Sequence, residues 1–406
     1  MSIGTGAHME AELDKTTLLQ NLNDKITRFI IHLTVKNPLQ GAGFVLLLGL
    51  AGIAGYNILF GNFTIQLFAQ QFIIGLSTGS IYALIALGYT LVYGILFMIN
   101  FAHGEVFMAG AYIGFFAIHA MEESGFLESY TALALLMTVL VGMIASVIVA
   151  VLLERIAYRP LRNAPRLVPL ITAIGASITL NQLFLLLFGS SPRRFPDVQL
   201  YVPGFGKNLI NTDDCHLEDG LRVCQQGLDL VGGLYDVNIL GMTLRLRPMN
   251  FIVLIMSFVF MMGLWTLIQR TKTGRAIRAV AEDKNTSRLM GINVDRVVVI
   301  TFVLGAALAG AGAVMFSLIP GNGQVTPGMG FTPGIKAFTA AVVGGIGNIP
   351  GAMFGGMFLG IMESIGPPLL GMDHQLKDVV SFGLLVFVLI FKPTGFMGEV
   401  LSGKKA

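Results

Sequence analysis

Long apolar blocks divided by short polar stretches are the main pattern in this chain. A helix needs about 20 mostly apolar residues to cross the hydrocarbon core of a bilayer. Ten segments reach or approach that length, near residues 41–60, 67–95, 101–121, 130–153, 167–189, 249–269, 297–319, 335–347, 351–366 and 376–392. The pattern predicts an all-α, polytopic membrane protein with about eight to ten transmembrane helices, some of them broken or re-entrant.

The eighth and ninth segments, 335–347 and 351–366, are each shorter than a bilayer crossing. Between them lie helix-breaking and polar residues, namely Gly344, Gly345, Gly347, Asn348, Pro350 and Gly351. Backbone outside a helix is tolerated at membrane depth only inside protein or beside a water-filled cavity. The two segments are therefore candidates for half-spanning helices that meet near a polar pathway, with Asn348 as a lining residue.

The chain divides into three parts. Residues 1–40 form an N-terminal segment, 41–395 a membrane domain and 396–406 a short tail. Apolar residues recur at helical spacing over 19–33 with charged residues between them, which predicts a helix along the membrane surface; a frayed polar tail is the alternative. We find no cleavable signal peptide pattern in the first forty residues, so internal helices are expected to direct insertion.

Composition leads to the same class of protein. Apolar residues make up 54% of the chain and charged residues only 12%, too few to cover the surface of a soluble protein of this size. Fifty glycines fit helices that pack closely in a membrane. The basic residues gather in two short loops between apolar blocks, without a known nucleic-acid-binding fold signature, which argues against nucleic-acid binding.

The distribution of Lys and Arg predicts the orientation. Residues 155–166 contain four Arg and no acidic residue, and residues 270–296 contain seven Lys or Arg against three Asp or Glu. Short loops rich in basic residues lie in the cytoplasm. Both loops are therefore expected to be cytoplasmic, the interval 190–248 extracytoplasmic, and both termini cytoplasmic.

The chain has only two cysteines, Cys215 and Cys224, and both lie in the extracytoplasmic interval. A disulfide between them is the favoured interpretation, because an oxidising compartment would permit it. A metal site built from Asp213, Asp214, His216 and the cysteines is the alternative, but its spacing matches no usual zinc pattern. We predict no metal site elsewhere.

Polar residues interrupt the apolar segments at 75–105. Ser77, Thr78 and Ser80 accompany small residues that form a close-packing helix face, which packing alone could explain. Asn100, His103 and Glu105 stand between two apolar spans, where polar groups usually face a cavity or a partner. The alternative is a helix end at the cytoplasmic interface, with Asn100 as the cap and Glu105 in the first turn. The two interpretations are compatible, so we take all of these residues, with Asn348, as candidates that line a pathway.

Two further segments are unusual. In the basic loop 270–296, apolar residues at helical spacing predict a short amphipathic helix, which suits docking of another protein; a solvated basic loop is the alternative. The region 320–350 is rich in Gly and Pro, and backbone groups freed at helix breaks can contact a polar solute. Lys336 in this region is interpreted as an interfacial residue whose amine reaches the membrane surface, rather than as a ligand.

At three segments the chain resembles the LivH-type permeases of branched-chain amino-acid importers. The similar phrases are GSIYALIALGYTLVYGILFMINFAHGE at 79–105, TGRAIRAVAEDKNTSRLMGINVDRV at 273–297, and KAFTAAVVGGIGNIPGAMFGG at 336–356. The similarity extends over most of residues 67–395.

The resemblance implies a component of an ATP-driven importer in the bacterial inner membrane. Its expected partners are a second, LivM-like permease, two cytosolic ATP-binding subunits and a periplasmic amino-acid-binding protein that delivers Leu, Ile or Val. In this family the loop 270–296 carries the coupling helix, so Arg278, Asp283, Arg288 and Gly291 become candidates for contacts with the ATPase. Asn285, Thr286 and Ser287 replace the acidic-alanine triplet that is usual in ABC importers, which puts contacts by the triplet itself in doubt.

The chain contains no Walker motif, so ATP is expected to be bound by partner subunits and the chain itself to be neither an enzyme nor a cofactor protein. Two other functions stay open. A related permease could carry urea, short-chain amides or other amino acids, and a protein of a different class could act alone as a secondary transporter or channel.

Overall fold

A computed structural model describes residues 38–398, apart from residues 62, 162–163, 166, 197, 199, 203–209, 219–220, 227, 240–241 and 320–323. The predicted surface helix over residues 19–33 and the end of the tail, 399–406, lie outside the described residues. The described part is almost entirely helical, which confirms the predicted all-α class.

Eight helices of the described part are long and apolar enough to cross a membrane. They are α3 (Ile65–Leu96), α4 (His103–Glu123), α6 (Thr131–Leu153), α7 (Leu167–Phe188), α8 (Pro248–Arg270), α11 (Val294–Leu318), α13 (Ile349–Leu369) and α14 (Lys377–Phe391). Helix α6 continues into a π-helical turn (η1, Glu154–Tyr158) and a 3-10 turn (η2, Arg159–Leu161). The remaining helices are α2 (Pro38–Phe60), α5 (Phe126–Ser129), α9 (Lys272–Glu282), α10 (Lys284–Leu289) and α12 (Phe331–Gly344). The part of α2 from Leu48 to Phe60 is a shorter apolar helix.

Helix α3 is the centre of the bundle. It packs against α13, α11, α12 and α8, and most of its side chains are buried. Its contact with α13 depends on glycine, because a Cβ atom added at Gly360 would lie 2.2 Å from the Cα atom of Gly79. Small residues thus let two helix backbones approach as closely as membrane helices can. The predicted packing face at Gly79 is confirmed.

Helices α12 and α13 differ from the prediction in one respect. Helix α12 has 14 residues and is too short to cross a bilayer, as its segment predicted. Helix α13 has 21 residues, from Ile349 to Leu369, so the prediction of a half-spanning ninth segment is wrong. The predicted segment stops at 366, whereas the helix continues through Pro367 and Pro368, which lie within its last turn. A 3-10 turn, η3 (His374–Leu376), then leads into α14.

The interval 190–248, predicted to be extracytoplasmic, contains strands that the sequence did not predict. An antiparallel sheet has the order β4-β3-β6-β7, formed by β3 (Ile210–Glu218), β4 (Leu221–Gln226), β6 (Tyr235–Ile239) and β7 (Met242–Leu246). The short strand β2 (Tyr201–Val202) pairs with β5 (Leu228–Asp229), and β1 (Arg193–Arg194) pairs with β8 (Gln324–Val325). The last pairing ties the start of this interval to the Gly- and Pro-rich segment before α12.

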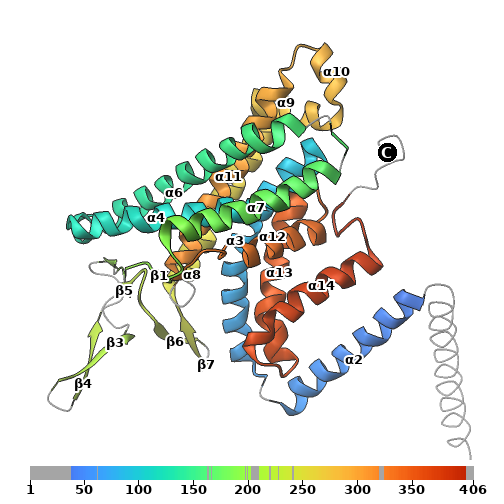
Figure 1. The fold of residues 1–406 in the computed structure, drawn as a ribbon. Helices are drawn as coiled ribbons and strands as arrows, with labels where there is room; N and C mark the ends of the chain where they lie inside the picture. Colours follow the sequence, from blue (N-terminus) through green and yellow to red (C-terminus); the bar gives the residue numbers. More distant parts are fainter. Residues whose placement is uncertain are drawn as a thin grey trace, which may run out of the picture.

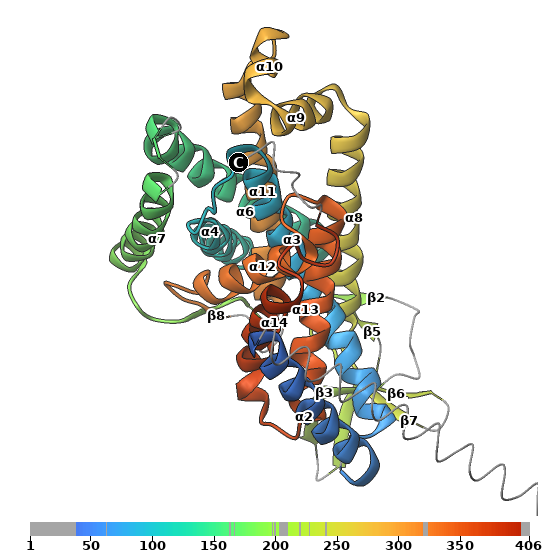
Figure 2. The same cartoon turned by 90° about the vertical axis from the view of Figure 1, so that its right-hand side faces the viewer.

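The sheet and the basic loop lie at opposite ends of the molecule. Figures 1 and 2 show α9 and α10 at one end of the helix bundle, with β3, β6 and β7 at the other. This arrangement agrees with the opposite sidedness that the loop charges predict for the two regions.

Candidate functional site

The polar run between α3 and α4 lies inside the protein. Asn100, His103 and Glu105 are each at most 3% exposed. Helix α4 begins at His103, and its N-cap residue, Ala102, makes no side-chain cap. The interpretation of Asn100 as a helix cap is therefore wrong: its Oδ1 atom accepts a hydrogen bond from the Tyr158 hydroxyl at 2.6 Å. The position of Glu105 in the first turn of α4 is confirmed.

The Glu105 carboxylate lies deep along the bundle. Its Oε1 atom accepts a hydrogen bond from the Ser177 hydroxyl at 3.3 Å. Ser177 comes ten residues after the first residue of α7, which corresponds to about 15 Å along a helix axis. Since the hydrocarbon core is about 30 Å thick, this depth is near its middle.

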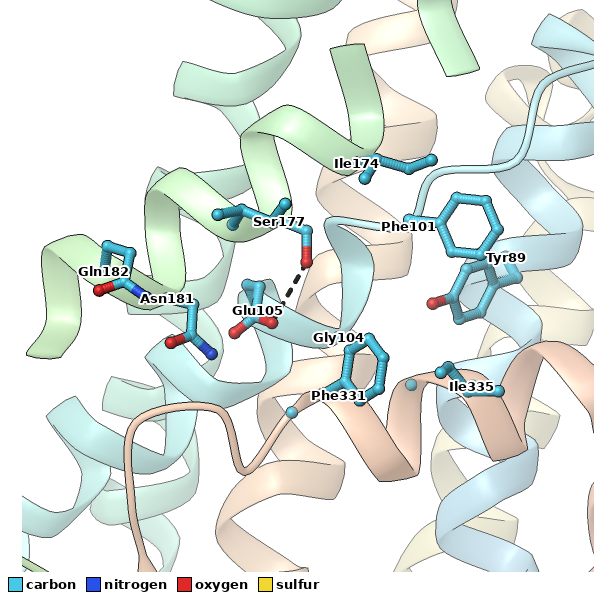
Figure 3. Close-up of a pocket in the computed structure, with 13 residues that line it drawn as sticks. Tyr89, Phe101, Gly104, Glu105, Ile174, Ser177, Asn181, Gln182, Phe331 and Ile335 are labelled. Carbon is cyan, nitrogen blue, oxygen red and sulfur yellow. Dashed lines mark hydrogen bonds between the residues drawn. The ribbon is translucent and has the colours of Figure 1, made fainter. Parts of the chain in front are cut away.

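A cavity of about 370 Å3 adjoins this carboxylate, and we call it the Glu105 cavity. Residues of α3, α4, α7 and α12 and of the segments before α4 and α12 surround it, and most of them are apolar (Figure 3). They are Tyr89, Phe101, Gly104, Glu105, Ile174, Ser177, Ile178, Asn181, Gln182, Gly330, Phe331, Gly334 and Ile335.

Two glycines allow α4 and α12 to begin beside each other at this cavity. A Cβ atom added at Gly330 would overlap the carbonyl oxygen of Gly104, and one added at Gly104 would lie 2.5 Å from the carbonyl oxygen of Gly330. The close approach brings the first turns of both helices to one wall. Glu105 and Phe331 consequently border the same cavity (Figure 3).

His103 lies next to this site without lining it. Its ring packs edge-on against the Tyr89 ring, with 4.9 Å between the centroids, and its Nε2 atom would be 2.2 Å from a Cβ atom at Gly88. The absence of a side chain at Gly88 thus makes room for the imidazole between α3 and α4.

A second cavity, of about 300 Å3, lies nearer the end of α13 that precedes η3, and we call it the Lys336 cavity. Its lining combines apolar and charged residues from α3, α12, α13 and the start of α14. They are Ile74, Thr78, Tyr82, Phe316, Met329, Thr332, Pro333, Lys336, Gly360, Glu363, Ser364, His374, Lys377 and Asp378.

Lys336 is buried at this cavity, with 2% of its surface exposed, so its interpretation as an interfacial residue is wrong. Its Nζ atom lies 2.7 Å from Glu363 Oε1 and 2.6 Å from Asp378 Oδ1. Glu363 also accepts hydrogen bonds from the hydroxyls of Tyr82, at 3.3 Å, and Ser381, at 3.1 Å. These contacts compensate the buried amine, which could otherwise not remain charged at this depth.

Glu363 was not among the residues predicted from the sequence. The signal was present, because it is a single acidic residue within an apolar segment that continues to Ile365. Ionisable residues in such segments are rare and usually paired or functional. The sequence interpretation considered Lys336 alone and did not identify Glu363, its partner on the next helix.

The remaining pathway candidates have mixed positions. Thr78 lines the Lys336 cavity. Ser77 and Ser80 are buried within α3, where the Ser80 hydroxyl donates to the Ser77 carbonyl oxygen at 2.7 Å. Asn348 caps α13, with its Oδ1 accepting from Gly351 N, and its amide donates to the Met397 carbonyl oxygen at 2.7 Å. Thr78 and Glu105 are thus the predicted residues that border one of the two cavities.

The basic loop forms a braced pair of short helices, as its apolar spacing predicted for the first of them. Ile277 and Val280 of α9 are buried against the bundle. The Arg278 guanidinium donates to Gln269 Oε1 of α8 at 2.6 Å. Asp283 caps α10 by accepting from the backbone N–H of Asn285 at 2.8 Å. The contacts of Arg278 and Asp283 therefore hold the shape of the loop.

The end of α10 presents apolar side chains to solvent. Leu289 and Met290 are 88% and 78% exposed. Gly291 follows with φ +82°, a left-handed conformation that ends the helix, as predicted. Arg288 borders a shallow cavity between this loop and the end of α3. Two large exposed apolar residues at the tip of a braced loop are typical of a protein contact site.

The cysteines lie opposite each other in the extracytoplasmic sheet. The ladder of β3 and β4 pairs Cys215 with Cys224, which suits the predicted disulfide. Their side chains lie outside the described residues, so the disulfide and its metal alternative stay predictions. Within the described part, no three His, Cys, Asp or Glu side chains gather into a group able to hold a metal ion.

The chain is similar to known permeases. The model of the family described as the permease component of branched-chain amino acid transport systems matches residues 71–389. The match includes both cavities and the basic loop.

Individual relatives are similar over most of their length. The high-affinity branched-chain amino acid transport system permease protein BraD of Pseudomonas aeruginosa is 43% identical over 335 residues, which are 82% of this chain and 96% of the relative. The corresponding protein LivH of Escherichia coli K12 is 40% identical over 338 residues, with the same coverage of both chains. The fructose import permease protein FrcC of Rhizobium meliloti is 35% identical over a shorter stretch, 31% of this chain and 36% of the relative. No solved structure matches significantly.

Proposed function

Because the chain belongs to the family of branched-chain amino acid transport permeases, we propose that it is a membrane subunit of an ATP-driven importer for Leu, Ile and Val. The observation that carries the proposal is the 40–43% identity to BraD and LivH permeases over 82% of the chain. Residues that the comparison covers include both cavities and the braced loop.

The Glu105 cavity supports a transport role. It combines a buried carboxylate with apolar walls. Its wall residues on α7 and α12 are in part exposed at the surface of this chain, including Ile178 and Phe331. A cavity open at the side of one chain can become a closed pathway when a second chain covers it. We therefore propose that this chain forms half of a pathway with a LivM-like permease.

The exposed end of α10 supports coupling to a motor protein. Leu289 and Met290 project from a loop that contacts with α8, α11 and α3 hold in place. Force applied at this loop would reach three helices of the bundle, including the central one. We propose that two cytosolic ATP-binding subunits dock beneath the membrane domains at such loops, and that a periplasmic binding protein delivers the amino acid from the other side.

Energy must then come from the partners. ATP binding can shift the pathway between inward- and outward-facing states only if ATP binds the two states with different affinity. The chain has no Walker motif to bind ATP. We propose that it undergoes alternating access without chemistry of its own, with the cytoplasmic loop moved by the partners.

The test is transport by the assembled complex in proteoliposomes. The chain, a LivM-like permease, the ATP-binding subunits and the binding protein should take up radiolabelled leucine when ATP is present on the cytoplasmic side. Replacing leucine by urea or acetamide should abolish uptake above background. Omission of ATP should abolish leucine uptake.

Two outcomes would contradict the proposal. Uptake by this chain alone, driven by a sodium or proton gradient, would assign it to stand-alone secondary transporters. ATP-dependent uptake of urea or amides in preference to Leu, Ile and Val would keep the architecture and change the solute.

A further inference from the structure

The Glu105 carboxylate differs from Glu363, another buried acidic group of the bundle. Glu363 lies beside a lysine amine and accepts two hydroxyl donors. Glu105 is 2% exposed, and the donors next to its carboxylate are the neutral side chains of Ser177, 3.3 Å from Oε1, and Asn181. No lysine, arginine or histidine lines the described cavity. A buried carboxylate without a compensating charge is costly, and a bound cation would remove that cost.

The walls indicate what kind of cation would fit. Ile174 and Ile335 contribute aliphatic surface, and Phe331 and Phe101 contribute aromatic rings (Figure 3). Ile178 also lines the cavity. A small inorganic cation would require several oxygen ligands, and these walls supply few. An organic cation with an apolar body matches both the negative charge of Glu105 and the apolar walls. The volume of about 370 Å3 lies at the lower end of the ~300–1,000 Å3 that small-molecule sites occupy.

Donors for a carboxylate are also present. Asn181 and Gln182 follow Ser177 on α7, and their side-chain amides border the same cavity (Figure 3). Amide N–H groups can donate to a ligand carboxylate while a protein carboxylate accepts from a ligand ammonium. A zwitterion with an aliphatic side chain has an ammonium group for Glu105, a carboxylate for the amides and an apolar body for the walls.

We propose that the Glu105 cavity is a substrate subsite, where Glu105 binds the α-ammonium group of an aliphatic amino acid and Ile174, Ile178 and Phe331 contact its side chain. The inference rests on the proposed import function. It assigns recognition within the membrane to this chain, in addition to selection by a binding protein.

The first test is Glu105→Gln in the reconstituted complex, compared with the wild type. Glutamine keeps the size of the side chain and can still accept from Ser177, but it lacks the negative charge. Leucine uptake should fall at least about tenfold, because truncating a buried charge pair affects binding strongly. ATP hydrolysis stimulated by the loaded binding protein should stay within about twofold of the wild type, because the variant leaves the cytoplasmic loop intact.

Three results would overturn the assignment. Wild-type leucine uptake in Glu105→Gln would show that the charge is dispensable. An equal fall in uptake and in stimulated ATP hydrolysis would place Glu105 in folding or coupling instead. Uptake that requires sodium or potassium in the wild type, and loses this dependence in Glu105→Gln, would assign the carboxylate to an inorganic ion.

A second variant tests the aliphatic wall. Ile178→Trp should narrow the cavity and lower uptake of leucine several-fold relative to valine, because apolar pockets discriminate by size. Leu187→Trp is the matched control, since nine residues along α7 is half a turn away and Leu187 does not line the cavity. An unchanged ratio of leucine to valine uptake in Ile178→Trp would remove the side-chain assignment.

The two tests separate this inference from the function on which it depends. If the wild-type complex takes up no branched-chain amino acid, the proposed function fails first. If the wild type is active and the variants behave like it, the import function stands and the subsite alone is refuted.

Discussion

Two sets of charged side chains in the bundle differ in whether a counter-charge compensates them. Lys336, Glu363 and Asp378 connect α12, α13 and α14 through contacts of 2.6 and 2.7 Å. Glu105 faces a cavity with one hydroxyl partner. The first group suits a structural role because each charge has a counter-charge, and the second suits a binding role because it has none.

Removing the amine from the compensated group should destabilise the protein strongly. In Lys336→Met, the Glu363 carboxylate loses its 2.7 Å partner while staying buried, which should lower the free energy of unfolding by about 3–5 kcal/mol. Thermal unfolding in detergent would measure the change as a lower midpoint.

The control is the double variant Lys336→Met with Glu363→Gln. It removes both charges and should recover part of the lost stability, because no unpaired carboxylate remains at Glu363. If the stability losses of Lys336→Met and Glu363→Gln alone sum to the loss of the double variant, the contact between Lys336 and Glu363 contributes nothing to stability.

Sequence reasoning at the scale of single residues succeeded where a residue type was out of place. Asn100, His103 and Glu105 were selected for polarity between apolar spans, and all three are buried. Reasoning failed for Lys336, because its partners Glu363 and Asp378 follow 27 and 42 residues later in the chain. A pairing between helices cannot be read from periodicity within one helix.

At the scale of helices, the central contact between α3 and α13 consists of glycine on both sides. Gly75 and Gly79 on α3 face Gly356 and Gly360 on α13, where an added Cβ atom would meet backbone. Backbone cannot move aside as a flexible side chain can. The contact thus fixes the position of α13, and with it the Glu363 carboxylate, relative to Tyr82 on α3.

Gly360→Ala should separate these helices and destabilise the bundle. The new methyl group would lie 2.2 Å from the Gly79 Cα atom, and forced overpacking costs about 1–3 kcal/mol. Gly383→Ala on α14 is the matched control, because an added Cβ atom there has no neighbour within 4 Å. The control should be neutral or slightly stabilising, since alanine favours helices. Equal unfolding midpoints for the two variants would refute the close contact.

The end of α10 should bind the proposed ATPase through its apolar residues. The double variant Leu289→Asp with Met290→Asp replaces exposed apolar surface with charge, so it should insert normally and abolish ATP-driven uptake. Leu289→Met keeps the apolar surface and serves as the control. Co-purification of the ATP-binding subunits would measure docking directly, and full retention of these subunits by the double variant would place the contact elsewhere.

Hydrophobic periodicity predicts where a helix lies better than it predicts the residue at which the helix ends. Helix α3 was predicted as 67–95 and spans Ile65–Leu96, because its apolar run has clear limits. Helix α13 extends past the predicted end, because packing beside α3 and α14 tolerates Pro367 and Pro368 in the last turn. The extracytoplasmic strands were missed because their interval is rich in Asp and Gly, which disfavour strands locally, and tertiary pairing overrides that preference.

At the scale of the whole molecule, one sequence signal locates both ends of the bundle. Basic residues mark the loop with α9 and α10, and the mixed-charge interval forms a sheet at the opposite end (Figures 1 and 2). The start of this interval connects to the segment before α12 through the pairing of β1 with β8, which forms a separate two-stranded sheet. Helix α12 in turn borders both cavities.

The sidedness of this arrangement can be tested with cysteine labelling. In a variant with Cys215→Ser, Cys224→Ser and Met290→Cys, the single thiol lies at the exposed tip of the basic loop. A membrane-impermeant maleimide should label it in inverted vesicles and leave it unlabelled in spheroplasts, because basic loops stay in the cytoplasm.

The wild-type protein supplies the opposite control in the same assay. Cys215 and Cys224 face each other across the β3–β4 ladder, so a disulfide should protect both from the maleimide. After reduction, spheroplasts should become labelled at these positions while sealed inverted vesicles stay unlabelled. Labelling of wild-type spheroplasts without reductant would refute the disulfide, and labelling of the Met290→Cys variant in spheroplasts would reverse the orientation. Both results test the same predicted asymmetry, in which basic residues keep one end in the cytoplasm and an oxidising compartment permits the disulfide at the other.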